Sequence, residues 1–243
     1  MGFDVVIPAR WESTRLPGRV LADLAGKPMI QRVYERAAQS DAEIVVVATD
    51  NEEIRQVVES FGGEATLTRN DHVSGTDRIA EVFADKRWKD ERVVVSVQGD
   101  EPFIDYRNID YAIKKHLENN CDNLFYTTLH QKIEDVKYLE SPSCLTVQFT
   151  RNNDVMTYSR SILPGNKTGK PDLEKYDYYG FTGIYVFNRE YLKEFHNMEN
   201  SKYQDIEDIE QMKIIENGYK IKTFECPYFN EISLNDSDDL EYL

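Results

Sequence analysis

The segment VVVSVQGDEP, residues 93–102, places two adjacent carboxylates two residues behind an almost uninterrupted run of β-branched side chains. Such a run predicts a strand that is buried on both faces, as in a parallel sheet covered by helices. Asp100 and Glu101 therefore fall at the tip of a buried strand. Adjacent negative charges are costly there unless a metal ion, a cationic substrate or solvent meets them. The sequence on both sides of this segment narrows the choice.

Short apolar runs alternate with longer amphipathic stretches along the chain. The runs that predict strands are 5–7, 44–48, 64–67, 92–97, 123–130, 145–150, 183–187 and 220–225. The patterns that predict helices are 29–39, 52–60, 77–85 and 205–216. This alternation predicts an α/β fold with a mostly parallel, mixed central sheet that is flanked by helices.

The length and composition suit one large domain. The 243 residues are 40% hydrophobic and 30% charged, and no repeat or linker interrupts them. We therefore expect a single domain over residues 1–243, in which residues about 123–190 form an inserted and more variable portion. The stretch 163–176 is rich in Gly, Pro, Asn and Lys, which predicts a mobile loop.

Charge and cysteine content argue against several classes of protein. The 29 basic and 44 acidic residues give a formal net charge of −15, which disfavours binding to nucleic acid or to an anionic membrane and favours solubility. Three cysteines without a Cys-x-x-Cys pair predict neither a disulfide framework nor a zinc site. The sequence shows no signal peptide, and no run approaches the ~20 apolar residues of a membrane span. We expect a cytoplasmic protein.

The segment PARWESTRLPGR, residues 8–19, follows the first predicted strand and combines three arginines, two hydroxyl side chains and one glycine. Ligands of open parallel sheets bind beyond the carboxyl ends of the strands, where this segment begins. Guanidinium groups and exposed backbone N–H groups suit a polyphosphate. The same composition is also compatible with a solvated basic loop, and neither interpretation is favoured by this segment alone.

The segment RNDHVSGTDR, residues 69–78, precedes a predicted helix with Ser74, Gly75 and Thr76. A helix N-terminus of this kind binds phosphate or hydroxyl groups, although a plain helix cap is the more common explanation. With a phosphate-binding loop near the same edge of the sheet, Asp100 becomes a candidate ligand for Mg²⁺, which binds one or two carboxylates together with substrate phosphates. Glu101 is expected to be a structural or solvent-facing residue.

These motifs together resemble one known family. IPARWESTRLPGRVLADLAGKPMIQRVYERA, VVVATDNEEI, FGGEATLTRNDHVSGTDRIAEV and VVSVQGDEPFI closely resemble the 3-deoxy-manno-octulosonate (Kdo) cytidylyltransferases, almost continuously over residues 3–104. VMTYSRSILP, TGIYVF, DIEDIEQMKIIENGYKI and NDSDDLEYL follow the family's outline more loosely.

The resemblance implies a Rossmann-like nucleotidyltransferase fold, usually a homodimer, that transfers CMP from CTP to a 2-keto-3-deoxy sugar acid and releases pyrophosphate. It implies that residues about 123–190 serve acceptor binding or dimerisation. The implied CTP-binding residues are Pro8, Ala9, Arg10, Ser13, Arg15, Arg19, His72, Ser74, Gly75 and Arg78, with Arg10, Arg15, Arg19 and Asp100 catalytic. The implied acceptor-binding residues are Gln98, Arg160, Phe181, Gln204, Glu207 and Gln211, and the implied Mg²⁺ ligands are Asp100 and either Asn235 or Asp236.

Several positions depart from the family pattern, mostly in the acceptor half. Arg19, Thr146, Phe181, Gln204 and Asn235 stand where the family has Lys, Lys, His, Glu and Asp. Because a site that relies on specific hydrogen bonds discriminates strongly when these partners change, three interpretations stay open. The chain is a Kdo enzyme with compensated changes, a cytidylyltransferase for another acidic acceptor such as a different ulosonic acid, or a non-catalytic nucleotide-binding relative.

Overall fold

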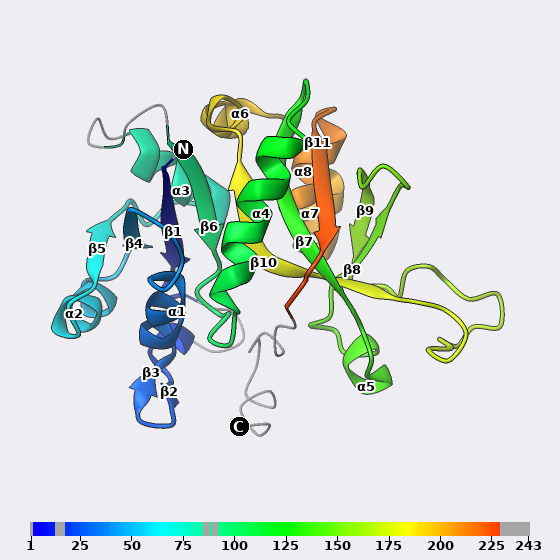
Figure 1. Ribbon diagram of the computed structural model, residues 1–243, viewed down its shortest axis with the longest axis horizontal. Coiled ribbons are helices and arrows are strands. Elements are labelled where there is room, and N and C mark those ends of the chain that lie inside the picture. Colours follow the sequence, from blue (N-terminus) through cyan, green and yellow to red (C-terminus); the bar gives the residue numbers. More distant parts are fainter. Residues whose placement is uncertain (1, 13–17, 85–87, 89–91, 229–243) are drawn as a thin grey trace.

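The computed structural model describes residues 2–12, 18–84, 88 and 92–228. These residues form an α/β fold whose central sheet has nine strands (Figure 1). Seven of the strands follow one another across the sheet in the order β11-β7-β10-β6-β1-β4-β5. Their bounds are β1 Phe3–Ala9, β4 Ile44–Thr49, β5 Glu64–Leu67, β6 Val93–Val97, β7 Leu124–Lys132, β10 Tyr179–Phe187 and β11 Lys220–Glu225. The predicted mixed, mostly parallel sheet is confirmed.

Alternating side chains of the central strands fill two hydrophobic cores, one on each face of the sheet. Val5 and Ile7 of β1 contribute to the core that is covered by α1 (Met29–Ala37), α2 (Glu52–Ser60) and α4 (Tyr106–Glu118). Val6 contributes to the opposite core, under α3 (Gly75–Ala84), α6 (Arg189–Glu194) and α8 (Gln211–Glu216). The buried β-branched runs that mark the sequence are therefore strands covered on both faces, as predicted.

One strand runs against its neighbours and brings the acceptor half of the chain to the site. β10 lies between β6 and β7 and is antiparallel to both. Its amino end therefore lies at the same edge of the sheet as the carboxyl ends of β6 and β1. A hairpin of β8 (Thr146–Phe149) and β9 (Val155–Ser159) extends the sheet from β10 at Gly180. Residues 163–176 contain no helix or strand, in agreement with the predicted loop.

The prediction of one helix over residues 205–216 is wrong. The structure has two short helices there, α7 (Lys202–Glu207) and α8, separated at Asp208, whose φ of 53° is left-handed. A continuous right-handed helix cannot contain this conformation. The elements α4, α6 and β9 were not predicted from the sequence, and neither were the short elements named next. A small hairpin of β2 (Asp23–Leu24) and β3 (Lys27–Pro28), the helix α5 (Val136–Leu139) and the short 3₁₀ segments Arg19–Leu21 and Phe195–Asn197 complete the fold.

Candidate active site

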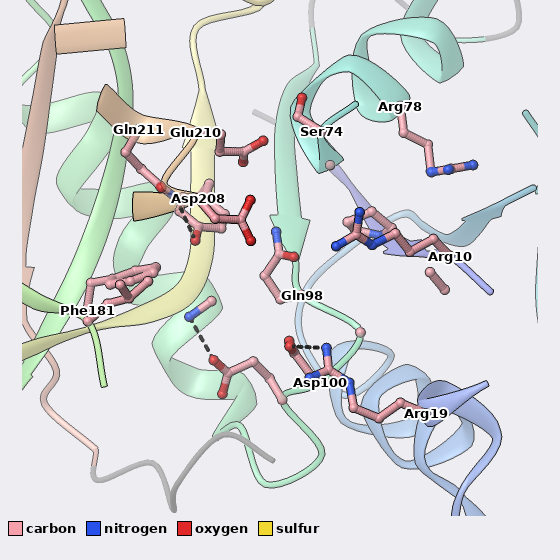
Figure 2. A pocket seen from close by; sticks show the side chains of 18 of the residues that line it. Arg10, Arg19, Ser74, Arg78, Gln98, Asp100, Phe181, Asp208, Glu210 and Gln211 are labelled. Atoms are coloured by element: carbon pink, nitrogen blue, oxygen red, sulfur yellow. Dashed lines mark hydrogen bonds and ion pairs between the residues drawn. The ribbon is translucent and has the colours of Figure 1, made fainter. Parts of the chain in front are cut away.

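A pocket of about 280 Å³ lies at the carboxyl edge of the sheet, between the β1–β6 strand ends on one side and β10, α7 and α8 on the other (Figure 2). Fourteen of the residues named from the sequence line it: Pro8, Ala9, Arg10, Arg19, His72, Ser74, Gly75, Arg78, Gln98, Asp100, Arg160, Phe181, Gln204 and Gln211. Segments from both halves of the chain thus meet at one cavity. Ser13, Arg15, Asn235 and Asp236 lie outside the described residues.

The strand-end carboxylate Asp100 is paired with a cation from the basic loop. Arg19 Nη2 donates to Asp100 Oδ2 at 2.7 Å, and the two side chains are 17% and 20% exposed. The positive group that the sequence led us to expect at the tip of β6 is thus Arg19 of the same chain. Both side chains line the pocket (Figure 2), so the pair faces the space where a ligand would bind.

Glu101, the second carboxylate, is a structural residue. It is 6% exposed, and its Oε1 accepts a hydrogen bond from the backbone N–H of Gly183 at 3.0 Å. A Cβ at residue 183 would lie 2.7 Å from the Glu101 side chain and 2.9 Å from Gln98 Cβ, so glycine is required for this close approach. The backbone N–H of Gln98 donates to the Gly183 carbonyl at 2.9 Å. These contacts fix the QGDEP turn against β10.

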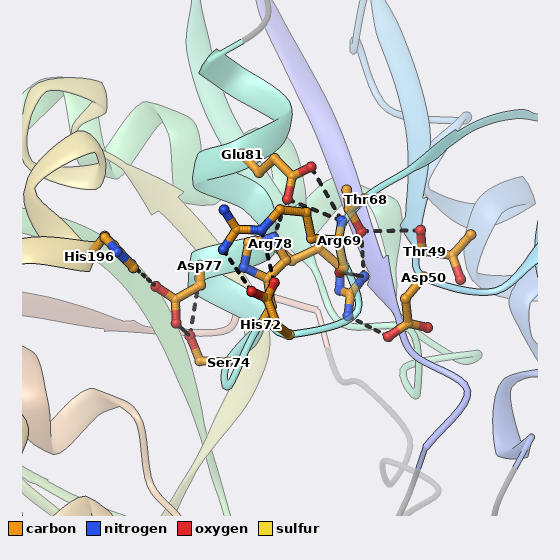
Figure 3. A network of polar contacts seen from close by, with 11 residues as sticks. Thr49, Asp50, Thr68, Arg69, His72, Ser74, Asp77, Arg78, Glu81 and His196 are labelled. Atoms are coloured by element: carbon orange, nitrogen blue, oxygen red, sulfur yellow. Dashed lines mark hydrogen bonds and ion pairs between the residues drawn. The ribbon is translucent and has the colours of Figure 1, made fainter.

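The segment before α3 forms the other wall of the nucleotide side. Ser74 Oγ accepts from the backbone N–H of Asp77 at 3.1 Å and donates to Asp77 Oδ2 at 2.8 Å. The cap interpretation is therefore confirmed, and Ser74 and Gly75 also line the pocket. His72 contacts the Glu81 carboxylate through Nε2 (Figure 3). This contact holds the residues ahead of the helix against its second turn.

Arg78 lines the pocket, but its guanidinium is already engaged by protein groups. Its Nη2 donates to Asp50 Oδ2 at 2.7 Å, its Nη1 contacts Thr68 Oγ1, and its side chain is only 4% exposed (Figure 3). An arginine held this way contributes to the shape of the wall. The sequence placed it around the nucleotide and did not identify the Asp50 pairing.

The acceptor side has an aromatic wall with a polar group behind it. Phe181 lines the pocket and packs edge-on against Tyr158 at a ring separation of 5.4 Å. Gln211 is 5% exposed, and its Nε2 donates to the Tyr185 hydroxyl at 3.2 Å. Burial raises the pKa of the Tyr185 hydroxyl well above its ordinary value. The tyrosine is therefore neutral at physiological pH and its oxygen can accept this hydrogen bond.

Arg160 and Glu207 connect β9 to the end of α7. Glu207 Oε2 accepts from Ser159 Oγ and from the backbone N–H of Arg160, each at 2.8 Å. The Arg160 guanidinium donates to the backbone carbonyls of Glu207, Pro142 and Asp208. Arg160 lines the pocket, whereas Glu207 is not among the lining residues. This pair therefore fixes the left-handed turn at Asp208, from which the pocket-facing part of the chain continues.

Glu210 and Asp208 also line the pocket and were not named from the sequence as site residues. Their carboxylates face the cavity near Gln98 (Figure 2). Glu210 accepts from the Thr76 hydroxyl at 2.9 Å and from the Thr76 backbone N–H at 3.3 Å, so it links the acceptor side to the first turn of α3. Burial raises the pKa of Glu210. The sequence signal for Glu210 is its position directly before Gln211. The break at Asp208, which directs Glu210 toward the pocket, was not predictable from the sequence.

Thr146 stands where the resembled family has lysine, and here it has a structural role. It is 1% exposed, its hydroxyl donates to the Ser161 carbonyl at 2.7 Å with the Ser159 carbonyl also within 3.2 Å, and it accepts from the backbone N–H of Leu163. The described residues contain no cluster of three or more His, Cys, Asp or Glu side chains that could hold a metal ion. Among these residues, too, no helix is both long and apolar enough to cross a membrane.

Comparison with known proteins first gives the class. A family profile described as cytidylyltransferase matches residues 5–221, and so the chain belongs to the cytidylyltransferases. The 3-deoxy-manno-octulosonate cytidylyltransferase of Francisella tularensis subsp. novicida (strain U112) is 39% identical over 239 residues, which are 98% of this chain and 95% of the relative. That of Histophilus somni (strain 2336) is 37% identical over 250 residues, covering 99% and 96%. Within the class, the chain is a member of the 3-deoxy-manno-octulosonate cytidylyltransferase family.

Solved structures agree with this assignment. A CMP:2-keto-3-deoxy-manno-octonic acid synthetase complexed with CTP superimposes with a TM-score of 0.85 at 35% identity, covering 100% of this chain and 96% of that protein. The 4-diphosphocytidyl-2C-methyl-D-erythritol synthase of Anaerococcus prevotii DSM 20548 has a TM-score of 0.59 at 11% identity, a likeness of fold alone. The expected Rossmann-like nucleotidyltransferase fold is thereby confirmed.

Proposed function

We propose that this protein transfers CMP from CTP to Kdo or a closely related ulosonic acid. The anomeric hydroxyl oxygen of the acceptor forms a bond to the α-phosphorus, the bond between the α- and β-phosphates breaks, pyrophosphate leaves, and the hydroxyl proton passes to solvent. The observation that carries the proposal is the likeness over the whole chain to a synthetase solved with CTP. The pocket adds the fitting chemistry, because basic groups and a helix N-terminus line the side formed by the β1 and β6 ends.

Arg10 and Arg19 are the described cations that would neutralise the triphosphate. Arg10 is exposed at the end of β1, and Arg19 lies across the pocket edge beside Asp100. The backbone at Ser74 and Gly75, at the N-terminus of α3, offers N–H groups at the positive end of the helix dipole. Phosphoryl transfer depends mainly on positioning and on charge neutralisation, and these groups supply both.

The residues at the tip of β6 also fit a magnesium ion that arrives with the nucleotide. Asp100 is 20% exposed and lines the pocket, so its carboxylate is accessible from the cavity. One carboxylate together with phosphate oxygens is a donor set typical of Mg²⁺. A bound Mg²⁺ would neutralise charge on the phosphates. Asn235 and Asp236 remain the proposed second ligands from outside the described residues.

A second acceptor is favoured by one observation, the position of Phe181 on the pocket wall. An apolar ring where relatives carry an imidazole suits an acceptor with fewer or repositioned hydroxyls, or with a deoxy or amino group. Gln204 lines the same side and is neutral where the family pattern has a carboxylate. A different ulosonic acid therefore remains the alternative substrate of the same reaction.

The proposal is tested by a pyrophosphate-release assay with CTP, UTP, ATP and GTP against a panel of sugar acids. We expect turnover with CTP and Kdo. Because cytosine N4 is a donor and uracil O4 an acceptor, UTP should be used poorly. The double variant Phe181→His with Asn235→Asp distinguishes Kdo from a different acceptor. If the native chain does not turn over Kdo but the double variant does, the natural acceptor is a different sugar acid. No pyrophosphate release with any pair would contradict the proposed function.

We propose a homodimer in the cytoplasm that supplies a CMP-activated sugar for lipopolysaccharide or capsule polysaccharide, with residues about 123–190 used for acceptor binding or for the dimer. Family resemblance supports these points. Analytical ultracentrifugation measures the assembly state, and a sedimentation coefficient of a 28.3 kDa monomer at micromolar concentration would contradict the dimer.

A further inference from the structure

Asp50 follows β4 at the carboxyl edge of the sheet, and it is held rigidly on both sides. Thr49 before it is fully buried and pairs in register with Ala9 of β1. Asn51 after it caps α2 by accepting hydrogen bonds from two backbone N–H groups. A side chain on such a fixed backbone can hold its partners with little freedom of its own.

The two carboxylate oxygens of Asp50 bind two different segments. Oδ1 accepts from the backbone N–H of Trp11 at 3.2 Å, and Oδ2 accepts from Arg78 Nη2 at 2.7 Å. The Asp50 side chain is 13% exposed and that of Arg78 is 4% exposed (Figure 3). Asp50 is not among the residues that line the pocket.

Trp11 is the residue at which the basic loop is closed. Its carbonyl accepts from the backbone N–H of Gly18 at 3.0 Å, and a Cβ at Gly18 would lie 3.3 Å from its ring. Gly18 has a left-handed φ of 68°, which a residue with a Cβ adopts only with strain. Trp11 therefore fixes the base of the loop between Arg10 and Arg19, and Asp50 attaches that base to the sheet.

Arg78 gives the second connection, to the helix that forms the opposite wall. It belongs to α3, whose first turn brings Gly75 to the pocket. Its other guanidinium nitrogen contacts Thr68 Oγ1, and that hydroxyl donates to the Thr49 carbonyl at 3.1 Å. Asp50, Thr68 and the end of β4 thus hold α3 at a fixed distance from the strand ends.

We propose that Asp50 is a positioning residue for CTP binding, which sets the spacing between the basic loop and the α3 N-terminus. This inference rests on the proposed function, since it concerns the nucleotide side of the same pocket. Without the carboxylate, the Trp11 N–H loses its acceptor and Arg78 becomes a buried cation without its countercharge. Both walls then shift relative to each other, while the acceptor side keeps its own contacts.

The test compares Asp50→Ala and Asp50→Asn with the native chain. CTP affinity is measured by calorimetric titration, and KM for CTP and for the acceptor and kcat are measured separately. For Asp50→Ala we expect a loss of CTP affinity of about tenfold or more, with kcat at saturating CTP and KM for the acceptor nearly unchanged. The CTP affinity of Asp50→Asn should lie between those of the native chain and Asp50→Ala, because the amide oxygen still accepts from Trp11 but carries no charge for Arg78.

The neighbouring strand β1, which pairs with β4, offers a matched control. Asp4 is fully buried near the amino end of β1 and pairs with Arg92 at 2.7 Å. Asp4→Ala and Asp4→Asn should lower the unfolding midpoint without selective loss of CTP affinity.

Equal CTP affinity of native chain and Asp50→Ala would overturn the role of Asp50, and so would equal losses in the Asp4 and Asp50 variants. A native chain that does not bind CTP would overturn the proposed function itself, and with it this role. If Asp50→Ala does not fold, Asp50→Asn decides by the same comparison.

Discussion

The two sides of the pocket are built in different ways. The nucleotide side consists of strand ends: Arg10 directly follows β1, and Asp100 is the third residue after β6. The acceptor side consists of a break between two six-residue helices and the amino end of an antiparallel strand. Its pocket residues are held by side-chain contacts such as Gln211 to Tyr185 and Glu207 to Arg160.

Because of this difference, amino-acid substitutions on the two sides of the pocket should have different effects. A strand end is fixed by backbone hydrogen bonds to both neighbours, so the residues beyond it are positioned whatever the acceptor is. On the acceptor side each position depends on particular polar partners, and substitution there changes what is recognised. The departures at Phe181 and Gln204 both fall on this side. We therefore expect variants on the two sides to affect different kinetic constants.

The largest effect is expected for Asp100→Asn on the nucleotide side. The amide keeps the shape but removes the charge opposite Arg19 and the proposed ligand for Mg²⁺. Turnover should fall by at least about 100-fold, as for loss of one electrostatic contact in the transition state. The unfolding midpoint should shift little, because the pair is partly exposed. Near-normal kcat at saturating magnesium would remove Asp100 from the catalytic groups.

A smaller effect, on the acceptor side, is expected for Glu207→Ala. This removes the carboxylate that accepts from Ser159 and Arg160, and with it the support of the turn at Asp208. Charged hydrogen bonds contribute about 1.5–3 kcal/mol, which corresponds to a fall of roughly 10- to 150-fold in kcat/KM for the acceptor. KM for CTP should stay nearly constant. Exposed Glu190 on α6 provides the control Glu190→Ala; a parallel loss of CTP affinity in Glu207→Ala would break the separation of the two sides.

Sequence reasoning succeeded where local pattern determines structure. The buried strands, α1–α3 and the QGDEP turn follow from periodicity and from motifs at strand ends, and the pocket residues Arg10, Ser74 and Asp100 follow from the rule that ligands bind at this edge. The helix α4 was not predicted, although the sequence carries a signal for it: Asp105 as N-cap and apolar residues at helical spacing, Ile109, Ala112 and Ile113.

The rest depends on tertiary contacts that no local pattern encodes. Residues 205–216 have a good helical pattern, yet Asp208 is left-handed, and the distant Arg160 donates to the backbone carbonyls of Glu207 and Asp208 at this break. The pairing of Arg78 with Asp50 joins residues 28 positions apart. Arg19 as partner of Asp100 lies 81 positions away, and only the fold brings these groups together.

Acid should lower the free energy of unfolding through two buried histidines at strand β7. His116 and His130 are buried, hydrogen-bond to Thr127 and Thr223, and their pKa values are lowered by burial from 6.5 to about 4. The unfolded chain therefore binds more protons than the folded chain between these two values, so stability is full above pH 6.5 and falls as the pH decreases toward 4.

By pH 5 the expected loss is about 2 kcal/mol of unfolding free energy for each imidazole relative to pH 8. Urea unfolding at pH 8, 6.5 and 5 measures it. His116→Gln, which cannot be protonated, should flatten the pH dependence by about that amount, and exposed His196→Gln is the control. Identical pH dependence of native chain and His116→Gln would contradict the assignment.

The smallest effect is expected for Tyr185→Phe, which tests a single neutral hydrogen bond behind the acceptor wall. The ring keeps its packing against Tyr126 and Phe181, but Gln211 Nε2 loses the acceptor that now holds it. A bond of this kind contributes about 1 kcal/mol, so KM for the acceptor should rise about fivefold while KM for CTP stays constant. Buried Tyr158, on the same aromatic cluster, has a hydroxyl that makes no hydrogen bond to Gln211, so Tyr158→Phe is the matched variant for packing. If both variants change the acceptor KM equally, the effect comes from packing and Gln211 is not positioned by the hydroxyl. If only Tyr185→Phe changes it, the acceptor side depends on this single neutral hydrogen bond between Tyr185 and Gln211.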